Sequence, residues 1–233
     1  CLLSRGLGDV YKRQTVNASG LSFEEILKQK QDVSESLELK FSKHASMRLE
    51  NRKINLSKEV AGLKKVVVGL GWDAAKQGLF GHKPNIDCDA SAIILGRGNK
   101  YRGVVYYGDR SAEDGCVYHH GDNLTGDGAG DDEQITVNLD KMPEDVEKVV
   151  FVVNIYACTS RKQDFGLIEN AFIRLVDDAT GKEICKYNLS ENYAGKTAMV
   201  FAEVYKKDGE WKFNAIGQGT NDTSISELTN RYK

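Results

Sequence analysis

Hydrophobic and polar residues follow two different patterns along this chain, and the change occurs near Ile54. Within residues 22–52, apolar residues recur at intervals of three and four, as at Phe23, Ile26 and Leu27. That spacing predicts a helical segment. From Ile54 onward, short β-branched and aromatic runs are separated by Gly, Asn and Asp, which is the pattern of β-strands.

The β-rich part contains a series of candidate strands. They are short and fairly evenly spaced, and turn-forming residues rather than regular helices separate them, which favours antiparallel pairing over β-α-β units. We therefore predict a mainly β fold, an antiparallel β-sandwich with short helices and an N-terminal helical extension. Ser224 and Glu227 predict the cap of a short C-terminal helix. The candidate strands are Lys64–Gly71, Ala90–Leu95, Gly103–Tyr107, Gln134–Leu139, Lys148–Tyr156, Ala171–Val176, Ile184–Leu189, Ala198–Lys206 and Trp211–Ile216.

These patterns divide the chain into four segments. Residues 1–14 contain Asp9–Gln14, which resembles a translated sequencing adapter, and we interpret them as non-native sequence. Residues 15–53 are predicted to be a helical linker or the remnant of an upstream region. Residues 54–222 are predicted to form the β-sandwich domain, and residues 223–233 a short C-terminal helix or tail.

Composition mainly excludes classes of partner. The formal charge is −2 and the pI about 6.2, so the molecule lacks the basic field that drives nucleic-acid binding. No apolar run approaches the roughly 20 residues of a membrane-spanning helix, and we expect a cytoplasmic protein. Cys88, Cys116, Cys158 and Cys185 are widely spaced and form no CxxC pair, so we expect them to be buried apolar side chains.

Acidic residues are concentrated in one stretch, residues 111–140, which contains eight Asp or Glu and no Lys or Arg. Within it, residues 121–133 carry four glycines, which let the backbone turn tightly and bring carbonyl and carboxylate oxygens together. Converging carboxylates repel one another unless a cation lies between them. The interleaved glycines therefore favour a metal-binding loop over a merely solvated acidic one.

The chemistry of this loop fits Ca²⁺, which takes six to eight oxygen ligands, better than Mg²⁺, which retains its waters. The spacing Asp127–Asp131 lacks the alternating ligands of an EF-hand, so the expected geometry is a loop that leads onto a strand. Three further acidic residues lie near predicted strand ends. Asp87 and Asp89 share one face at the start of a strand, and Asp73 follows a Gly-rich segment.

Five motifs, taken together, resemble the TerD family of bacterial tellurium-resistance and stress-response proteins over about residues 54–220. They occur in the order and approximate spacing of that family. Where the family commonly has a His-containing stretch, this chain has Asn154-Ile155-Tyr156, and no ligand role is carried over there. The motifs are Leu70-Gly71-Trp72-Asp73, Asp87-Cys88-Asp89-Ala90-Ser91, the acidic loop Gly121–Glu133, Arg161-Lys162-Gln163-Asp164-Phe165-Gly166 and Gly217-Gln218-Gly219.

The resemblance implies a calcium-binding β-sandwich in which the acidic segments meet at one end. It also implies a non-enzymatic role in tellurite resistance and general stress response. Calcium would organise a loop surface for protein partners in a stress-response complex at the membrane periphery. The candidate metal ligands are Asp73, Asp87, Asp89, Asp122, Asn123, Asp127, Gly130, Asp131, Asp132 and Glu133.

Two functions of other classes remain open at this stage. One is a small-ligand sensor of the cyclic-nucleotide type, which would need a basic, aromatic-lined pocket apart from the acidic residues. The other is a metal-dependent hydrolase, in which the carboxylates would hold catalytic ions beside a substrate cleft. His119 and His120 adjoin the acidic loop, but no third imidazole or thiol stands at ligand spacing, so we expect exposed or packed side chains.

Overall fold

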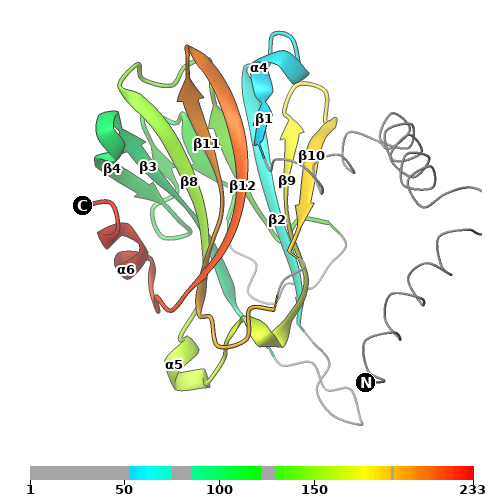
Figure 1. The fold of residues 1–233 in the computed structure, drawn as a ribbon, viewed down its shortest axis with the longest axis vertical. Coiled ribbons are helices and arrows are strands. Elements are labelled where there is room, and N and C mark those ends of the chain that lie inside the picture. Colours follow the sequence, from blue (N-terminus) through cyan, green and yellow to red (C-terminus); the bar gives the residue numbers. More distant parts are fainter. Residues whose placement is uncertain (1–52, 75–84, 122–129, 190–191) are drawn as a thin grey trace, which may run out of the picture. The chain divides into compact units, whose positions relative to one another are not determined.

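The computed structural model describes residues 53–74, 85–121, 130–189 and 192–233. Contacts divide the chain into two compact units, Cys1–Leu49 and Glu50–Lys233, and all described residues belong to the second. In the described part, two six-stranded antiparallel sheets pack face to face (Figure 1), which confirms the predicted β-sandwich. The predicted N-terminal helical extension and the segment of residues 1–14 lie outside the described residues.

The first sheet has the strand order β1-β12-β11-β8-β3-β4. Its central strands β3 and β8 contain the apolar runs Ala92–Leu95 and Val149–Val153, because both faces of these strands are covered. The inner face meets the second sheet, and α6 (Ile225–Asn230) covers part of the outer face. The strands are β1 (Lys53–Asn55), β3 (Cys88–Gly96), β4 (Tyr101–Val105), β8 (Val146–Ile155), β11 (Ala198–Lys207) and β12 (Glu210–Thr220).

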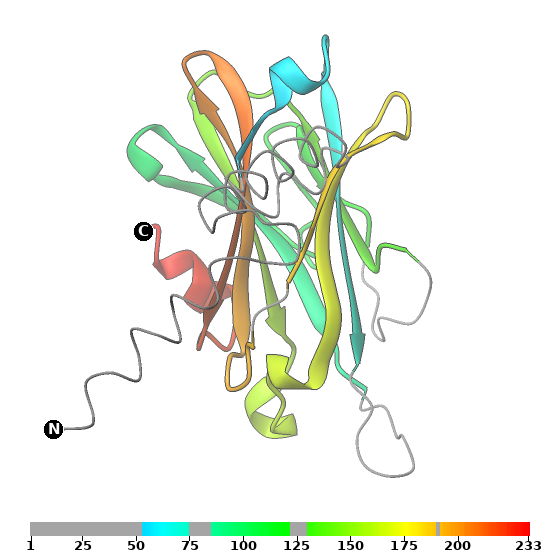
Figure 2. The ribbon, with the colours of Figure 1, turned by 45° about the vertical axis from the view of Figure 1, so that its right-hand side comes forward.

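The second sheet has the order β10-β9-β2-β7-β6-β5 and lies beside the first in both views (Figure 2). Strands β7 and β9 alternate between buried and part-exposed residues, as expected when only one face is packed on the core. The strands are β2 (Lys65–Ala74), β5 (Ser111–Ala112), β6 (Val117–His119), β7 (Glu133–Asn138), β9 (Ile168–Asp177) and β10 (Glu183–Asn188). Each of the nine predicted strands has a counterpart, whereas β1, β5 and β6 were not predicted.

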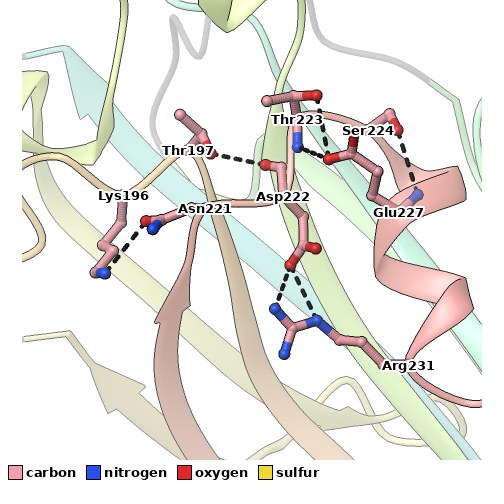
Figure 3. A network of polar contacts seen from close by, with 8 residues as sticks. All are labelled: Lys196, Thr197, Asn221, Asp222, Thr223, Ser224, Glu227 and Arg231. Carbon is pink, nitrogen blue, oxygen red and sulfur yellow. Dashed lines mark hydrogen bonds and ion pairs between the residues drawn. The ribbon is translucent and has the colours of Figure 1, made fainter.

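Helix α6 (Ile225–Asn230) packs on the outer face of the first sheet through Leu228, which is fully buried. The predicted cap is confirmed: the Ser224 hydroxyl accepts the Glu227 amide hydrogen, and the Glu227 carboxylate accepts that of Thr223 (Figure 3). Arg231 donates two hydrogen bonds to Asp222, which ties the end of the helix to the segment before it. Leu228 contacts a cluster formed by Ile93, Leu95, Val150, Val152, Ala198 and Val200.

The remaining short helices are α4 (Leu56–Glu59), α5 (Cys158–Arg161) and the 3₁₀ turns η1 (Arg97–Asn99) and η2 (Phe165–Leu167). The four cysteines within the described ranges are buried and free, as predicted. Among the helices of those ranges, none has the length and apolar character needed to cross a membrane.

Candidate metal centre

The acidic candidates within the described ranges lie at the end of the sandwich where β8 leads into α5 (Figure 1). Antiparallel pairing sets Leu70, near the end of β2, opposite Glu133, the first residue of β7. It likewise sets Cys88, the first residue of β3, opposite Ile155 at the end of β8. The candidates at this end are Asp73, Asp87, Asp89, Gly130, Asp131, Asp132 and Glu133, while Asp122, Asn123 and Asp127 lie outside the described residues.

Glu133 and His119 join the two sheets by bonding to the backbone of Ala90. Strand β4 pairs with β3 only from Ala92 onward, so no strand among the described residues pairs with the preceding backbone on that side. Glu133 Oε2 accepts the Ala90 amide hydrogen at 2.7 Å, and His119 Nε2 lies 3.2 Å from the Ala90 carbonyl oxygen. Both side chains are fully buried. Together they satisfy the donor and the acceptor that a neighbouring strand would otherwise satisfy.

The hydrogen bonds of His119 determine which of its ring nitrogens carries a hydrogen. Its Nδ1 accepts the Gly121 amide hydrogen at 3.1 Å, so that nitrogen carries no proton, and Nε2 carries the hydrogen that faces the Ala90 carbonyl. Both ring nitrogens are therefore occupied by the fold. The expectation of a packed imidazole holds for His119, and His120 is exposed with Nε2 2.7 Å from Thr136 Oγ1.

Asp87 and Asp89 lie at the start of β3, next to residues at the end of β8. Asp89 is paired with Asn154, whose Nδ2 is 3.5 Å from Asp89 Oδ2, and both residues are buried. Asp87 Oδ2 lies 3.6 Å from Nη1 of Arg161 in α5. The Asn154 Oδ1 atom is buried and accepts no hydrogen bond within the described ranges. A buried oxygen acceptor without a donor therefore stands beside the Asp89 carboxylate.

The pKa of the Cys88 thiol reflects the negative charges that surround it. Burial raises its pKa well above the ordinary value, and the nearby charges of Asp89, Glu133, Asp87 and Asp132 raise it further. Asp89 and Glu133 lie in β3 and β7, and Asp87 and Asp132 directly precede these two strands, which belong to different sheets. The fold thus brings separate acidic segments of the sequence into one electrostatic neighbourhood.

Asp131 lies on the outer face of the second sheet, where other side chains already hold its carboxylate. Arg174 of β9 donates from Nε to Oδ1 at 2.6 Å and from Nη2 to Oδ2 at 3.0 Å. Gln134 Nε2 donates to Oδ2 at 2.9 Å. The Asp131 side chain is only 1% exposed. The hydrogen bond to Asp131 is the main cause that raises the pKa of Arg174 above its ordinary value.

Asp132 and Asp73 are placed by β2. The Asp132 amide donates to the Leu70 carbonyl at 2.8 Å, and Asp132 Oδ2 accepts the Trp72 amide hydrogen at 2.7 Å. Asp73, which is part-exposed, accepts a hydrogen bond of 2.9 Å from Asn170. The end of the acidic loop is therefore laid along the last residues of β2.

A recess of about 480 Å³ opens beside Asp73 and Asp132. Its wall includes Phe172, with Lys186 Nζ 3.5 Å from the centre of the ring. The recess combines a basic and an aromatic side chain, but it adjoins the acidic residues. A small-ligand sensor was expected to need such a pocket apart from them.

In the ranges that the structure describes, no group of three or more His, Cys, Asp or Glu side chains is close enough to form a complete metal site. The acidic candidates directly contact side chains that were not predicted from the sequence, including His119, Gln134, Asn154, Asn170 and Arg174. Asn154 stands in the stretch to which we carried over no ligand role, and Arg174 reads as an ordinary outward residue of an alternating strand. A polar Asn at the end of the apolar run of β8 is the one signal that could have been used.

Comparison with known proteins gives one consistent family. The TerD domain model matches residues 46–232. The stress response protein SCP2 of Bacillus subtilis (strain 168) is 52% identical over 192 residues, which cover 78% of this chain and 96% of that protein. Tellurium resistance protein TerD of Serratia marcescens is 44% identical over 169 residues, covering 71% and 86% respectively.

A solved structure agrees with the fold. The crystal structure of a homologue of telluride resistance protein (TerD) from Streptomyces coelicolor A3(2) superposes with a TM-score of 0.60. It covers 74% of this chain and 99% of that chain at 24% identity. At that identity the likeness speaks for the β-sandwich alone.

Proposed function

Because the chain belongs to the TerD family, we propose that it acts in bacterial tellurium resistance and stress response as a non-enzymatic calcium-binding domain. The names of its relatives support the physiological role. The calcium role is supported by the residues at the acidic end of the sandwich, and above all by Asn154. Its buried Oδ1 has no donor within the described ranges and lies beside the Asp89 carboxylate.

An unsatisfied buried acceptor costs about 1–3 kcal/mol, and a cation next to it would remove that cost. A proton donor would do the same for the amide alone, but a cation would also relieve the repulsion among the neighbouring carboxylates. Every candidate atom is an oxygen, which is the ligand type of Ca²⁺ rather than of zinc or copper. The donor set therefore fits calcium.

The residues that would hold calcium are oxygen-bearing side chains at the acidic end of the sandwich, and they come from both sheets. We assign this role to Asp87, Asp89 and Asn154 on the β3–β8 side, and to Asp73 and Asp132 on the β2–β7 side. Asp122, Asn123 and Asp127, which lie outside the described residues, complete the candidate set. Glu133 contributes chiefly by holding Ala90, and hence the start of β3, in place.

When bound, Ca²⁺ supplies positive charge among these carboxylates and fixes the ends of the strands that carry them. The resulting surface would be recognised by protein partners of a cytoplasmic stress-response complex at the membrane periphery. The sensor alternative is not favoured, because the recess with Phe172 and Lys186 adjoins Asp73 and Asp132. We propose no catalytic step.

Calorimetric and thermal titration of metal-stripped protein tests the proposal. A ligand that binds only the native state at one hundred times its Kd stabilises it by about 2.7 kcal/mol. For a domain of this size we expect Ca²⁺ to raise Tm by about 5–10 °C. Mg²⁺ at the same concentration should raise it less, because it gives up its waters reluctantly.

Two matched Asp→Asn variants sharpen the test. Asp132→Asn keeps an oxygen that can accept the Trp72 amide hydrogen, and we expect it to weaken calcium binding by about tenfold or more, because a charged ligand is lost. Asp140→Asn removes the same charge from an exposed residue beyond the far end of β7 and should change binding little in ~0.15 M salt. Equal effects of both variants, or equal Tm with calcium and with chelator, would contradict the proposal.

A further inference from the structure

The carboxylate of Asp131 is held by a row of three residues on three neighbouring strands, and we call this position its seat. Register places Gly69 of β2 between Arg174 of β9 and Gln134 of β7. The Asp131 carboxylate lies over Gly69 and receives hydrogen bonds from both neighbours. A Cβ atom on Gly69 would overlap this carboxylate. The glycine therefore provides the space that Asp131 occupies.

Both oxygens of the Asp131 carboxylate accept hydrogen bonds in this seat. Arg174 contacts both oxygens with two of its nitrogens, which is the strong two-point form of an ion pair, and Gln134 adds a third donor. The side chain is almost completely buried by these contacts. A metal ion would have to displace a guanidinium group to reach these oxygens. The geometry is that of a fixed anchor rather than of a ligand.

The residue after the anchor, Asp132, is itself a calcium candidate. With Asp131 held over Gly69, the next amide bonds to Leu70, and Asp132 Oδ2 bonds to the Trp72 amide. The charge of Asp132 also acts on Cys88 between Asp87 and Asp89. Seating Asp131 thus sets where the chain leaves β2 and where the Asp132 carboxylate is presented.

We propose that Asp131 is a positioning residue, anchored by Arg174 over Gly69, and that this anchor sets the calcium affinity of the site through Asp132. The inference rests on the proposed function and changes the role of one candidate ligand. Residues that orient metal ligands typically change metal affinity by about 10–100-fold when they are replaced. The anchor also predicts that positions 69, 131 and 174 act as one unit.

The ligand and anchor roles predict opposite effects for Arg174→Gln. If Asp131 bound calcium, removing its guanidinium competitor would leave calcium binding unchanged or make it tighter. If Asp131 is an anchor, Arg174→Gln should weaken calcium binding by about tenfold, and Arg174→Lys, which keeps the charge, should recover part of the loss. The double variant Asp131→Asn/Arg174→Gln should bind no more weakly than the worse single variant.

Gly69→Ala tests the seat without changing either charged partner. The added methyl group should displace the carboxylate and lower calcium affinity by about tenfold, as for loss of an orienting residue. In the Asp131→Ala background the same change should have little further effect, because the obstacle is gone. Gly103→Ala is the matched control: Gly103 lies in β4, and a Cβ there meets nothing within 4 Å.

Calcium affinity is measured by calorimetry, and thermal unfolding in chelator reports stability separately. The proposal is supported if calcium affinity falls in Arg174→Gln and Gly69→Ala while both variants still unfold cooperatively. If Arg174→Gln does not fold, the milder variant Arg174→Lys is measured in its place. Unchanged or tighter binding in Arg174→Gln would overturn it. If the unmodified protein binds no calcium, the proposed function fails instead. Hydrogen exchange at residues 131–134 would still show whether Arg174 and Gly69 hold the segment.

Discussion

Replacing Glu133 should destabilise the fold far more than replacing an exposed glutamate, because its carboxylate serves a buried backbone amide. Glu133→Ala removes the 2.7 Å acceptor of the Ala90 amide and leaves that donor unsatisfied between the sheets. Losing a hydrogen bond to a charged group and leaving its buried partner unpaired together cost about 3 kcal/mol. For a domain of this size that corresponds to a fall in Tm of about 6–12 °C.

Glu133→Gln separates this structural role from a charge effect. The amide oxygen of Gln can still accept the Ala90 hydrogen, so we expect a loss of only about 1 kcal/mol. Glu147→Ala, an exposed change on β8, should stay within about 0.5 kcal/mol of the unmodified protein. Circular dichroism during thermal and urea unfolding, in chelator so that metal does not contribute, measures all three. An Ala variant as stable as the Glu147 control would refute the assignment.

Two further predictions concern the rest of the domain. Leu228→Ala should lower the free energy of unfolding by about 2–5 kcal/mol, because it removes the buried contact of α6 with the outer face of the first sheet. The exposed change Ser226→Ala should lower it little. Urea unfolding with an unchanged m-value would check this, and similar midpoints for the two variants would contradict it. Burial is the main cause that raises the pKa of Cys185 to about 12, so at pH 8 its thiol should stay protonated and resist a thiol reagent until denaturant is added, as peptide mapping would show. Rapid labelling of native Cys185 would contradict the buried state.

The sandwich was predictable because the order of apolar and polar residues along each longer strand follows the burial of that strand. Alternation in Glu133–Asn138 matches one buried face, and the apolar run Val149–Val153 within β8 matches a strand covered on both sides. Strands of two or three residues, such as Ser111–Ala112, contain too few positions for any period to be read. They form because longer neighbours present a free edge, which is a tertiary effect.

For the candidate metal centre, the sequence predicted which acidic residues gather but not what each one contacts. Asp131 and Glu133 belong to one acidic run, yet one is held by Arg174 on an outer face and the other by Ala90 between the sheets. Each partner is 43 residues away in the chain. Charge and glycine content describe the run itself, whereas these contacts depend on how strands pair. Pairing register was not available from composition or spacing.

The hydrogen bonds of Glu133 and His119 to Ala90 also affect whether a strand of another chain can pair with β3. Unpaired N–H and C=O groups along a strand edge offer a template to which a strand of another chain can add. Beyond the reach of β4, buried side chains occupy the backbone groups of Ala90 at that edge of β3. Strand-by-strand polymerisation through the backbone of Ala90 is therefore blocked.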